Sequence, residues 1–193
     1  MYGKTKAGVS LPVLVDPIGK VITVDDFSQA VLEGNCYYGA NQTGCVWTVE
    51  LATTYTGLCV SNPIGSGKNM LLWYAGYSEI VAPTGIADAW IALGYHASTN
   101  VVAGAAGTAR NLKAGGAAGK GQVWTGATLP VAPTYAFPVI NGHTSGALST
   151  AGVPGLVRIH GALPPGGFAI IANFTIGAAV GAKGAILWQE VDA

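Results

Sequence analysis

A glycine-rich phrase at residues 61–69, Ser-Asn-Pro-Ile-Gly-Ser-Gly-Lys-Asn, is the stretch of this sequence closest to a phosphate-binding loop. Such a loop needs a glycine, four residues, then Gly-Lys and a hydroxyl residue, placed between a strand and a helix, so that backbone N–H groups surround the phosphates. Here Asn62 occupies the first glycine position and Asn69 the hydroxyl position. Residues 70–81, which follow, are rich in aromatic and β-branched side chains, as is typical of a strand. We therefore interpret residues 61–69 as a polar turn between two strands, without nucleotide binding.

Other residues that could carry chemistry are scattered along the chain. His96, His143 and His160 show neither HxH nor HxxxH spacing, so a metal site would have to be assembled from distant parts of the fold. Asp25 and Asp26 are the only adjacent acids, and the sequence around them lacks the regularly spaced oxygen ligands of a calcium loop. We therefore predict no catalytic residue, no metal and no cofactor, and a protein that is not an enzyme.

The three cysteines, Cys36, Cys45 and Cys59, are odd in number and lie within one region. Cys36 and Cys45 could face each other across a hairpin. Because we find no secretory signal in the sequence, we expect all three thiols to be reduced and mostly buried. No CxxC pair that would indicate a zinc site is present.

The composition predicts an all-β fold whose surface contacts other protein. Half of the 193 residues are apolar, 29 are glycine and only 9% are charged, whereas about 25% of residues are charged in ordinary soluble domains. Many glycines and few helix-forming surface residues are typical of strands joined by turns. Because charge discourages association, we expect much of this charge-poor surface to meet other subunits.

Positive and negative charges are separated along the sequence. Residues 1–88 carry four lysines and seven acids, a net charge of −3 (4 − 7), whereas residues 89–189 carry five bases and no acid. This asymmetry suits charge-complementary packing between neighbours or docking on an anionic surface, although chance in a charge-poor chain is an equal alternative. The five basic residues in residues 89–189 are too few and too far apart to neutralise the phosphates of a nucleic acid. No apolar run approaches the roughly 20 residues needed to cross a bilayer.

The pattern of apolar residues and Gly/Pro turns predicts a single domain at residues 35–193, an antiparallel β-sandwich or jelly roll. Residues 45–51 alternate in polarity, with Trp47, Val49 and Leu51 on one face. Residues 69–81 are apolar on both faces, so we expect a central strand covered on both sides. The predicted strands are residues 45–51, 56–61, 69–81, 86–97, 122–125, 135–140, 156–161, 166–174 and 184–191.

Two segments are predicted to reach outside the sandwich. Residues 1–34 are interpreted as an extended N-terminal arm or short strands at 11–15 and 20–24, with one helical turn at 26–33. Twelve of the eighteen residues from Gly104 to Gly121 are Gly or Ala, which predicts a long loop that is flexible or becomes ordered against a partner. The residues predicted to contact a partner are Leu11, Pro12, Val13, Arg110, Leu112, Lys113 and Lys120.

Two patches of the sequence resemble structural proteins of tailed-bacteriophage virions. The first is Asn-Pro-Ile-Gly-Ser-Gly-Lys-Asn at residues 62–69, followed by a predicted strand. The second is Pro-Pro-Gly-Gly-Phe-Ala-Ile-Ile-Ala-Asn at residues 164–173, together with Ile-Leu-Trp-Gln-Glu-Val at residues 186–191. The resemblance implies a β-sandwich or jelly-roll subunit, often trimeric, that decorates a capsid, builds a head fibre or belongs to the tail. It implies no catalytic residues.

Together these features predict a capsid decoration (cement) protein, a homotrimer located in the virion after assembly in the host cytoplasm. Its expected partners are copies of itself and the major capsid protein or another virion protein, with no membrane and no direct contact with nucleic acid. The alternative is a carbohydrate-binding tail or fibre module whose exposed tryptophans stack on host glycans. A polysaccharide-degrading enzyme would need a cleft with paired carboxylates, which the acid-free second half of the chain disfavours.

Overall fold

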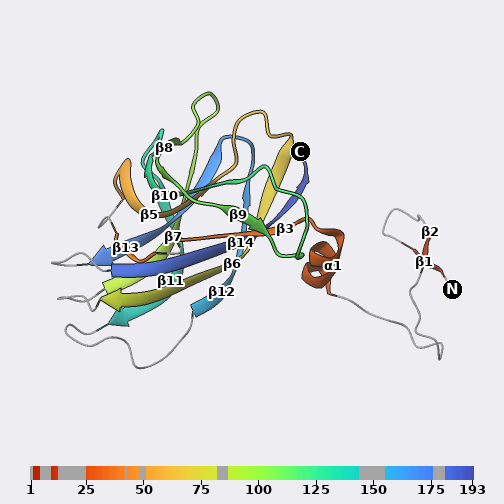
Figure 1. Ribbon diagram of the computed structural model, residues 1–193, viewed down its shortest axis with the longest axis horizontal. Helices are drawn as coiled ribbons and strands as arrows, with labels where there is room; N and C mark the ends of the chain where they lie inside the picture. The colour runs from red at the N-terminus through yellow and green to blue at the C-terminus, as the bar shows by residue number, and fades with distance from the viewer. Residues whose placement is uncertain are drawn as a thin grey trace.

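The computed structural model describes residues 2–4, 10–12, 25–41, 43–47, 51–81, 87–143, 155–175 and 181–193. Antiparallel strands in these ranges form two sheets that pack face to face, with one helix and a separate pair of short strands (Figure 1). The predicted all-β sandwich is therefore confirmed. In the described ranges, no helix has both the length and the apolar character needed to cross a membrane.

Each main sheet combines strands that lie far apart in the sequence. In spatial order, sheet I consists of β11 (Thr134–His143), β7 (Ala87–Tyr95), β13 (Gly167–Thr175), β5 (Thr54–Ser61), β10 (Gln122–Thr128) and β8 (Val102–Ala106). Sheet II consists of β12 (Gly155–Leu163), β6 (Lys68–Val81), β14 (Gly181–Asp192), β3 (Cys36–Ala40) and β9 (Ala109–Asn111), and β4 (Cys45–Val46) also pairs with β14. The separate pair is β1 (Tyr2–Lys4) and β2 (Ser10–Pro12), which Figure 1 shows apart from the sandwich.

The chain crosses between the sheets through short connections. β5 ends in sheet I and β6 begins in sheet II, so the predicted turn, observed at residues 62–67, joins the two sheets and does not close a hairpin. β8 is the edge strand of sheet I, β9 is the edge strand of sheet II, and only residues 107 and 108 separate them. This covalent link closes one side of the sandwich, while β11 and β12 are the edge strands of the other side.

Apolar side chains on the facing sides of the two sheets form the main core. In β14, Ile186, Trp188 and Glu190 are buried, whereas the intervening Leu187 and Gln189 are only half-buried. This period of two is that of a strand with one face in the core. The largest fully buried side chains of the main core are Trp47, Leu58, Met70, Ile91, Ile159, Leu163, Ile171, Ile186 and Trp188.

A second apolar cluster lies on the opposite face of sheet I. In β13, Phe168 and Ile170 belong to this second cluster, whereas Ala169 and Ile171 belong to the main core. β13 is therefore buried on both faces, as its nearly continuous apolar sequence requires. The other buried members of the second cluster are Tyr55, Cys59, Ala92, Val101, Ala127, Leu129 and Ala172.

The prediction that residues 69–81 would be covered on both faces is wrong. Met70 and Leu72 of β6 are buried in the main core, but Trp73 is only half-buried and Ile80 is 45% exposed. The side of β6 that faces away from the core is covered near its middle by α1 (Asp26–Glu33) and faces solvent further along. The strands that contribute buried residues to both clusters lie in sheet I and include β13 and β5.

The helical turn predicted at residues 26–33 is confirmed as α1. Asp25 is its N-cap, and its carboxylate accepts hydrogen bonds from the backbone N–H of Ser28 at 3.0 Å and from the Ser28 hydroxyl at 2.6 Å. Gly34 ends the helix in the left-handed conformation, with φ of 80°, and its N–H donates to the carbonyl of Val31. Both ends of α1 are thus specified by local sequence.

A β-bulge in β6 allows α1 to dock on sheet II. The register of β6 against β14 shifts at Trp73, which is an extra residue without an opposite partner in β14. Phe27 of α1 contacts both Trp73 and Tyr74, with ring centroids 5.4 Å apart in each pair. The bulge therefore presents two consecutive aromatic side chains to a single residue of the helix.

Most predicted strands are confirmed, but residues 45–51 are not a continuous strand. Only β4 is regular there, and residues 48–50 lie outside the described ranges. Trp47 is buried in the main core, whereas Leu51 packs on the second cluster, so the two do not share one face. The strands predicted from residue 56 onward are found as β5, β6, β7 and β10 to β14.

The Gly/Ala-rich segment is more regular than predicted. Residues 104–106 belong to β8 and residues 109–111 form β9, so the prediction of a loop without secondary structure is wrong for these residues. In the N-terminal arm, β1 and β2 pair with each other. Residues 13–24, which include the strand predicted at 20–24, lie outside the described ranges.

A matched pair of valines tests the main core. Val60 in β5 is fully buried, whereas Val102 in β8 is 60% exposed. We expect Val60→Ala to lower the free energy of unfolding by roughly 2 kcal/mol, because two methyl groups leave the core and a cavity remains. Val102→Ala should change it by less than about 0.5 kcal/mol. Urea denaturation measures both, and equal losses in the two variants would contradict the assignment of the core.

Candidate functional site

The predicted contact residues of the N-terminal arm are partly described. Leu11 and Pro12 lie in β2, where Leu11 pairs with Gly3 and Pro12 pairs with Tyr2. Neither β1 nor β2 pairs with a strand of sheet I or sheet II among the described residues. Val13 lies outside the described ranges. Two of these three residues therefore lie in a hairpin that, among the described residues, pairs with neither main sheet.

The other four predicted contact residues lie in one segment at the edge of sheet II. We call residues 109–121, which begin with β9, the edge segment. The side chains of Arg110, Lys113 and Lys120 are exposed, and Leu112 is half-buried. β9 pairs with β3, and the N–H of Leu112 donates to the carbonyl of Cys36 at 2.9 Å. The edge segment thus extends sheet II and carries three of the predicted contacts on its surface.

A buried carboxylate holds the C-terminal end of the edge segment. Glu190 of β14 is only 6% exposed. Its Oε1 accepts hydrogen bonds from the backbone N–H groups of Lys120 and Gly121, both at 2.8 Å, and from the indole N–H of Trp188 at 3.3 Å. The charge is thus satisfied by N–H donors. Sequence reasoning missed Glu190, although its position two residues after Trp188 on the inward face was a usable signal.

Asn111 and Lys113 hold the other end of the edge segment against α1. The amide Nδ2 of Asn111 donates to the carbonyl of Gly34 at 2.7 Å and to that of Ala117 at 3.0 Å. Lys113 Nζ donates to the carbonyl of Leu32 at 2.8 Å, in the last turn of α1, where a cation is favourable. The side chain of Lys113 is therefore bonded to α1 of its own chain.

A row of cross-strand neighbours runs across the outer face of sheet II. The register joins Arg158, Tyr74, Leu187, Tyr38 and Arg110 in this order, one residue from each strand. Residues directly opposite each other in adjacent strands point to the same face. The row therefore begins and ends with an exposed arginine and has two half-buried tyrosines and a half-buried leucine between them.

The next row of sheet II is flat because its residues are small. The register joins Leu156, Gly76, Ala185 and Ala40, of which only Leu156 is large, and it is 58% exposed. Lys183, two residues before Ala185 in β14, is exposed. Neither row contains an acidic residue. This part of the outer face is therefore shallow, partly apolar and bordered by cations.

The charges of α1 have the opposite sign. Asp25, Asp26 and Glu33 are exposed, and α1 contains no basic residue. The Glu33 carboxylate accepts hydrogen bonds from the neutral amides of Gln29 at 2.7 Å and Asn35 at 3.4 Å. Within the described ranges, the single ion pair is the exposed contact between Lys68 Nζ and Asp192 Oδ1, at 2.6 Å.

The glycine-rich phrase at residues 61–69 has a structural role. The amide Nδ2 of buried Asn62 donates to the carbonyls of Lys68 at 2.7 Å and Leu163 at 2.8 Å. The backbone of Asn62 also bonds to the turn at Gly166, whose N–H donates to the Asn62 carbonyl at 2.7 Å. Gly65 has a φ of 81°, in the left-handed region that favours glycine. β6 begins within the phrase at Lys68, so the predicted strand after the turn is found.

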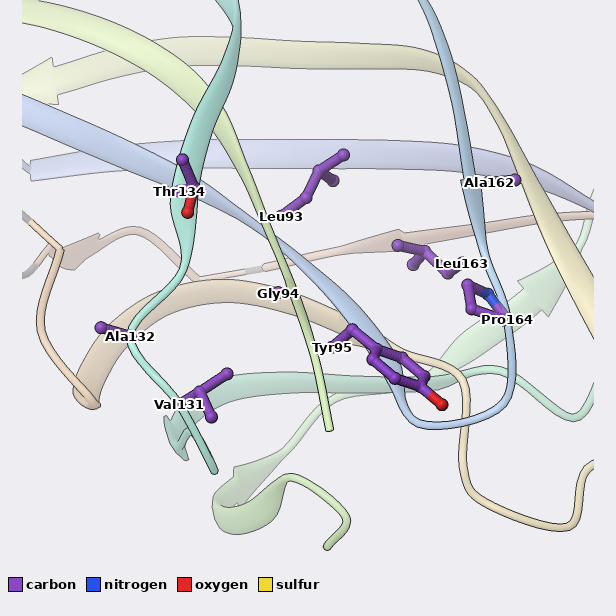
Figure 2. A pocket seen from close by; sticks show the side chains of 9 residues that line it. All are labelled: Leu93, Gly94, Tyr95, Val131, Ala132, Thr134, Ala162, Leu163 and Pro164. Atoms are coloured by element: carbon purple, nitrogen blue, oxygen red, sulfur yellow. The ribbon is translucent and has the colours of Figure 1, made fainter. Parts of the chain in front are cut away.

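One open hollow of about 390 Å³ lies at the β11–β12 side of the sandwich. Its walls come from the end of β7, the connection between β10 and β11, and the end of β12 (Figure 2). Thr134 and Tyr95 contribute its side-chain hydroxyl groups, and no residue of the lining is charged. The hollow can accept an apolar or aromatic group, but it lacks the paired carboxylates that glycoside hydrolysis needs.

The five tryptophans are poorly placed to stack on a sugar. Trp47 and Trp188 are fully buried. Trp73 is half-buried beneath Phe27 and the guanidinium of Arg158, whose carbon lies 5.5 Å from the ring centroid. The half-buried Trp90 packs edge-on against Tyr135, and the half-buried Trp124 donates its indole N–H to Ser61.

Cys36 and Cys59 are buried free thiols, and the side chain of Cys45 is not described. Among the residues described, no three His, Cys, Asp or Glu side chains come together as metal ligands.

Compared with known proteins, the chain matches no family model, no curated protein and no solved structure.

Replacing Glu190 tests whether its carboxylate orders the edge segment. We expect Glu190→Ala to lower the free energy of unfolding by roughly 3 kcal/mol, because several buried N–H donors lose their acceptor. Glu190→Gln keeps one acceptor oxygen and should lose about half as much. Hydrogen exchange at residues 112–121 should accelerate in Glu190→Ala. Unchanged exchange there would contradict the anchoring role.

The buried thiols predict a pH dependence. Burial raises the pKa of Cys36 from 9.0 to about 11 and also raises the pKa of Cys59. The folded protein therefore keeps these protons at pH values where the unfolded chain loses them, so this stabilisation is complete below pH 9 and is lost as the pH rises through about 11. In a Cys45→Ser variant at pH 8, iodoacetamide should label Cys36 about a hundredfold more slowly in the folded protein than in urea. Equal rates would contradict the assigned burial.

Proposed function

We propose that this chain is a non-enzymatic virion protein, a capsid decoration (cement) protein that binds the outer shell of a tailed-bacteriophage head as a homotrimer and stabilises it. The observation that carries the proposal is the distribution of charge. The acids of α1 and the arginines at both ends of the sheet II row form no ion pair with another described residue. Exposed charges of opposite sign on separate surfaces suit contacts with neighbouring protein.

The resemblance to virion proteins supports the proposal through a structural link. The phrase at residues 62–69 and the phrase at residues 164–173 lie far apart in the sequence. In the fold they are in contact, because the N–H of Asn62 donates to the carbonyl of Gly167 and the N–H of Gly166 donates to the carbonyl of Asn62. Lys68, within the first phrase, also pairs with Asp192, which follows residues 186–191. The similar residues therefore form one structural unit.

The proposed mechanism is mechanical. Each trimer would bind across a junction between capsomers and raise the work needed to separate them. Individually weak contacts, repeated by the symmetry of the shell, give high avidity. The proposed contacts with the shell are the β1–β2 hairpin, which pairs with neither main sheet in the described part of the chain, and the exposed Arg110 and Lys120 of the edge segment.

A carbohydrate-binding module is the second candidate. The hollow offers the aromatic ring of Tyr95, which is 55% exposed, and the hydroxyl of Thr134 at another place in its lining (Figure 2). The tryptophans do not add to this surface, since each is buried or half-buried. A glycan-array screen separates the candidates, because sugar binding abolished by Tyr95→Ala would favour the second.

Binding to undecorated phage heads tests the cement role. We expect the purified protein to sediment with the heads and to raise the temperature at which they break open. Leu11→Asp should weaken head binding at least tenfold, because it places a charge in the proposed arm contact. Val102→Asp, which adds the same charge at an exposed residue of β8, is the matched control and should bind normally. A wild-type protein that neither binds nor protects the heads would refute the role.

A further inference from the structure

The outer face of sheet II is divided into two parts. α1 covers one part, where Cys36 is fully buried and Trp73 and Tyr74 contact Phe27. The other part, which we call the open half, consists of Ala40, Gly76, Leu156, Arg158 and Ala185. Leu156 and Arg158 are exposed there, and the three small residues leave the surface shallow beside them.

Next to the open half, α1 forms a ridge with opposite charge. Asp26 and Glu33 are exposed at its two ends, and Leu32 is 61% exposed. The open half carries an exposed leucine, Leu156, like the ridge, and an exposed arginine, Arg158, whose charge is opposite to that of the ridge. Each surface thus combines a large apolar side chain with a charge that has no ion-pair partner among the described residues.

We propose that the ridge of α1 in one copy of this chain docks on the open half of sheet II in a second copy. Leu32 and Leu156 supply the apolar part of the contact, and the acids of α1 face Arg158. The occupant is another copy because the complementary surface is present on the same molecule. A contact between two different surfaces is heterologous, and it closes into a ring when the rotation between copies allows. This inference rests on the self-association included in the proposed function.

The small residues of the open half explain how the docking fits. Gly76, Ala185 and Ala40 lie side by side in the register, so a helix can approach the strands closely there. The row of Tyr74, Leu187 and Tyr38 borders these small residues on the same face. Apolar burial then contributes most of the affinity, and the charge pairs fix the orientation of the docked helix.

Charge reversal on each surface tests the docking with the full chain. Sedimentation equilibrium would compare wild type, Arg158→Glu, Glu33→Arg and the double variant, with circular dichroism to verify folding. We expect each single reversal to weaken self-association at least tenfold and the double variant to return to within about threefold of wild type. Lys120→Glu, which reverses an exposed charge on the edge segment, should associate like wild type. Raising the NaCl concentration should also weaken the wild-type association.

A matched pair of variants tests the apolar part of the proposed contact. Leu156→Asp should weaken self-association at least tenfold, whereas Val102→Asp, at a similarly exposed residue of sheet I, should leave it unchanged. Singly reversed variants that associate like wild type, or a wild type that remains monomeric at all concentrations, would overturn the docking. Head binding is measured separately, so a monomer that still binds heads would refute this contact and leave the cement role standing. The mass of the assembly tests the trimer independently of these variants.

Discussion

Apolar contact between the inner faces of sheets I and II is the interaction on which the rest of the structure depends. A buried Leu, Ile or Phe side chain contributes about 1.5–3 kcal/mol relative to an exposed one, and both sheets supply several such residues to one core. The close fit is visible at Gly184 of β14, where a Cβ atom would meet Ile171 of sheet I and Trp47, which follows β4 of sheet II. Sheet I carries a second cluster on its other face, so β13 lies at the centre of two apolar layers.

The connections are then fixed by buried polar side chains and not by further apolar contact. Asn41 donates to the carbonyl of Ala182 at 2.9 Å, Asn62 ties two turns together, and Glu190 binds the backbone of the edge segment. A buried polar group without a partner costs about 1–3 kcal/mol. Each of these side chains therefore favours one path of the backbone over its alternatives, which is how a segment rich in Gly and Ala is held in place.

The strands and turns could be predicted because their signals are local. The apolar runs at β7 and β11 to β14 and the turns at Gly/Pro clusters identify one sandwich, and Asp25 and Gly34 mark the ends of α1. The assignment of strands to sheets depends on contacts distant in sequence, so the turn at residues 62–67 could not be recognised as a link between sheets. The apolar pattern of β6 did not reveal which part of its outer face α1 would cover and which part would remain exposed.

The candidate surfaces were partly predictable for the same reason. Arg110 and Lys120 stood out as the long side chains of a segment of small residues, and the structure exposes both. The bond of Lys113 to a helix carbonyl 81 positions away in the sequence could not be predicted, because it depends on how the edge segment packs against α1. The row from Arg158 to Arg110 could not have been recognised, since it takes one residue from each of five strands and exists only in the register of sheet II.

Scarcity of charge constrains how such a molecule behaves beside its copies. With nine bases and nine acids the net charge is zero, so no long-range repulsion keeps two copies apart. Screening limits the attraction between exposed charges to about 8–10 Å at physiological salt, and thus Arg158 and the acids of α1 act only after the surfaces have met. The apolar and flat surfaces then decide whether copies associate, and the few charges decide in which orientation. On a surface with many charges, association and orientation would not be separate, because the charges of two approaching copies would repel or attract each other before the apolar surfaces met.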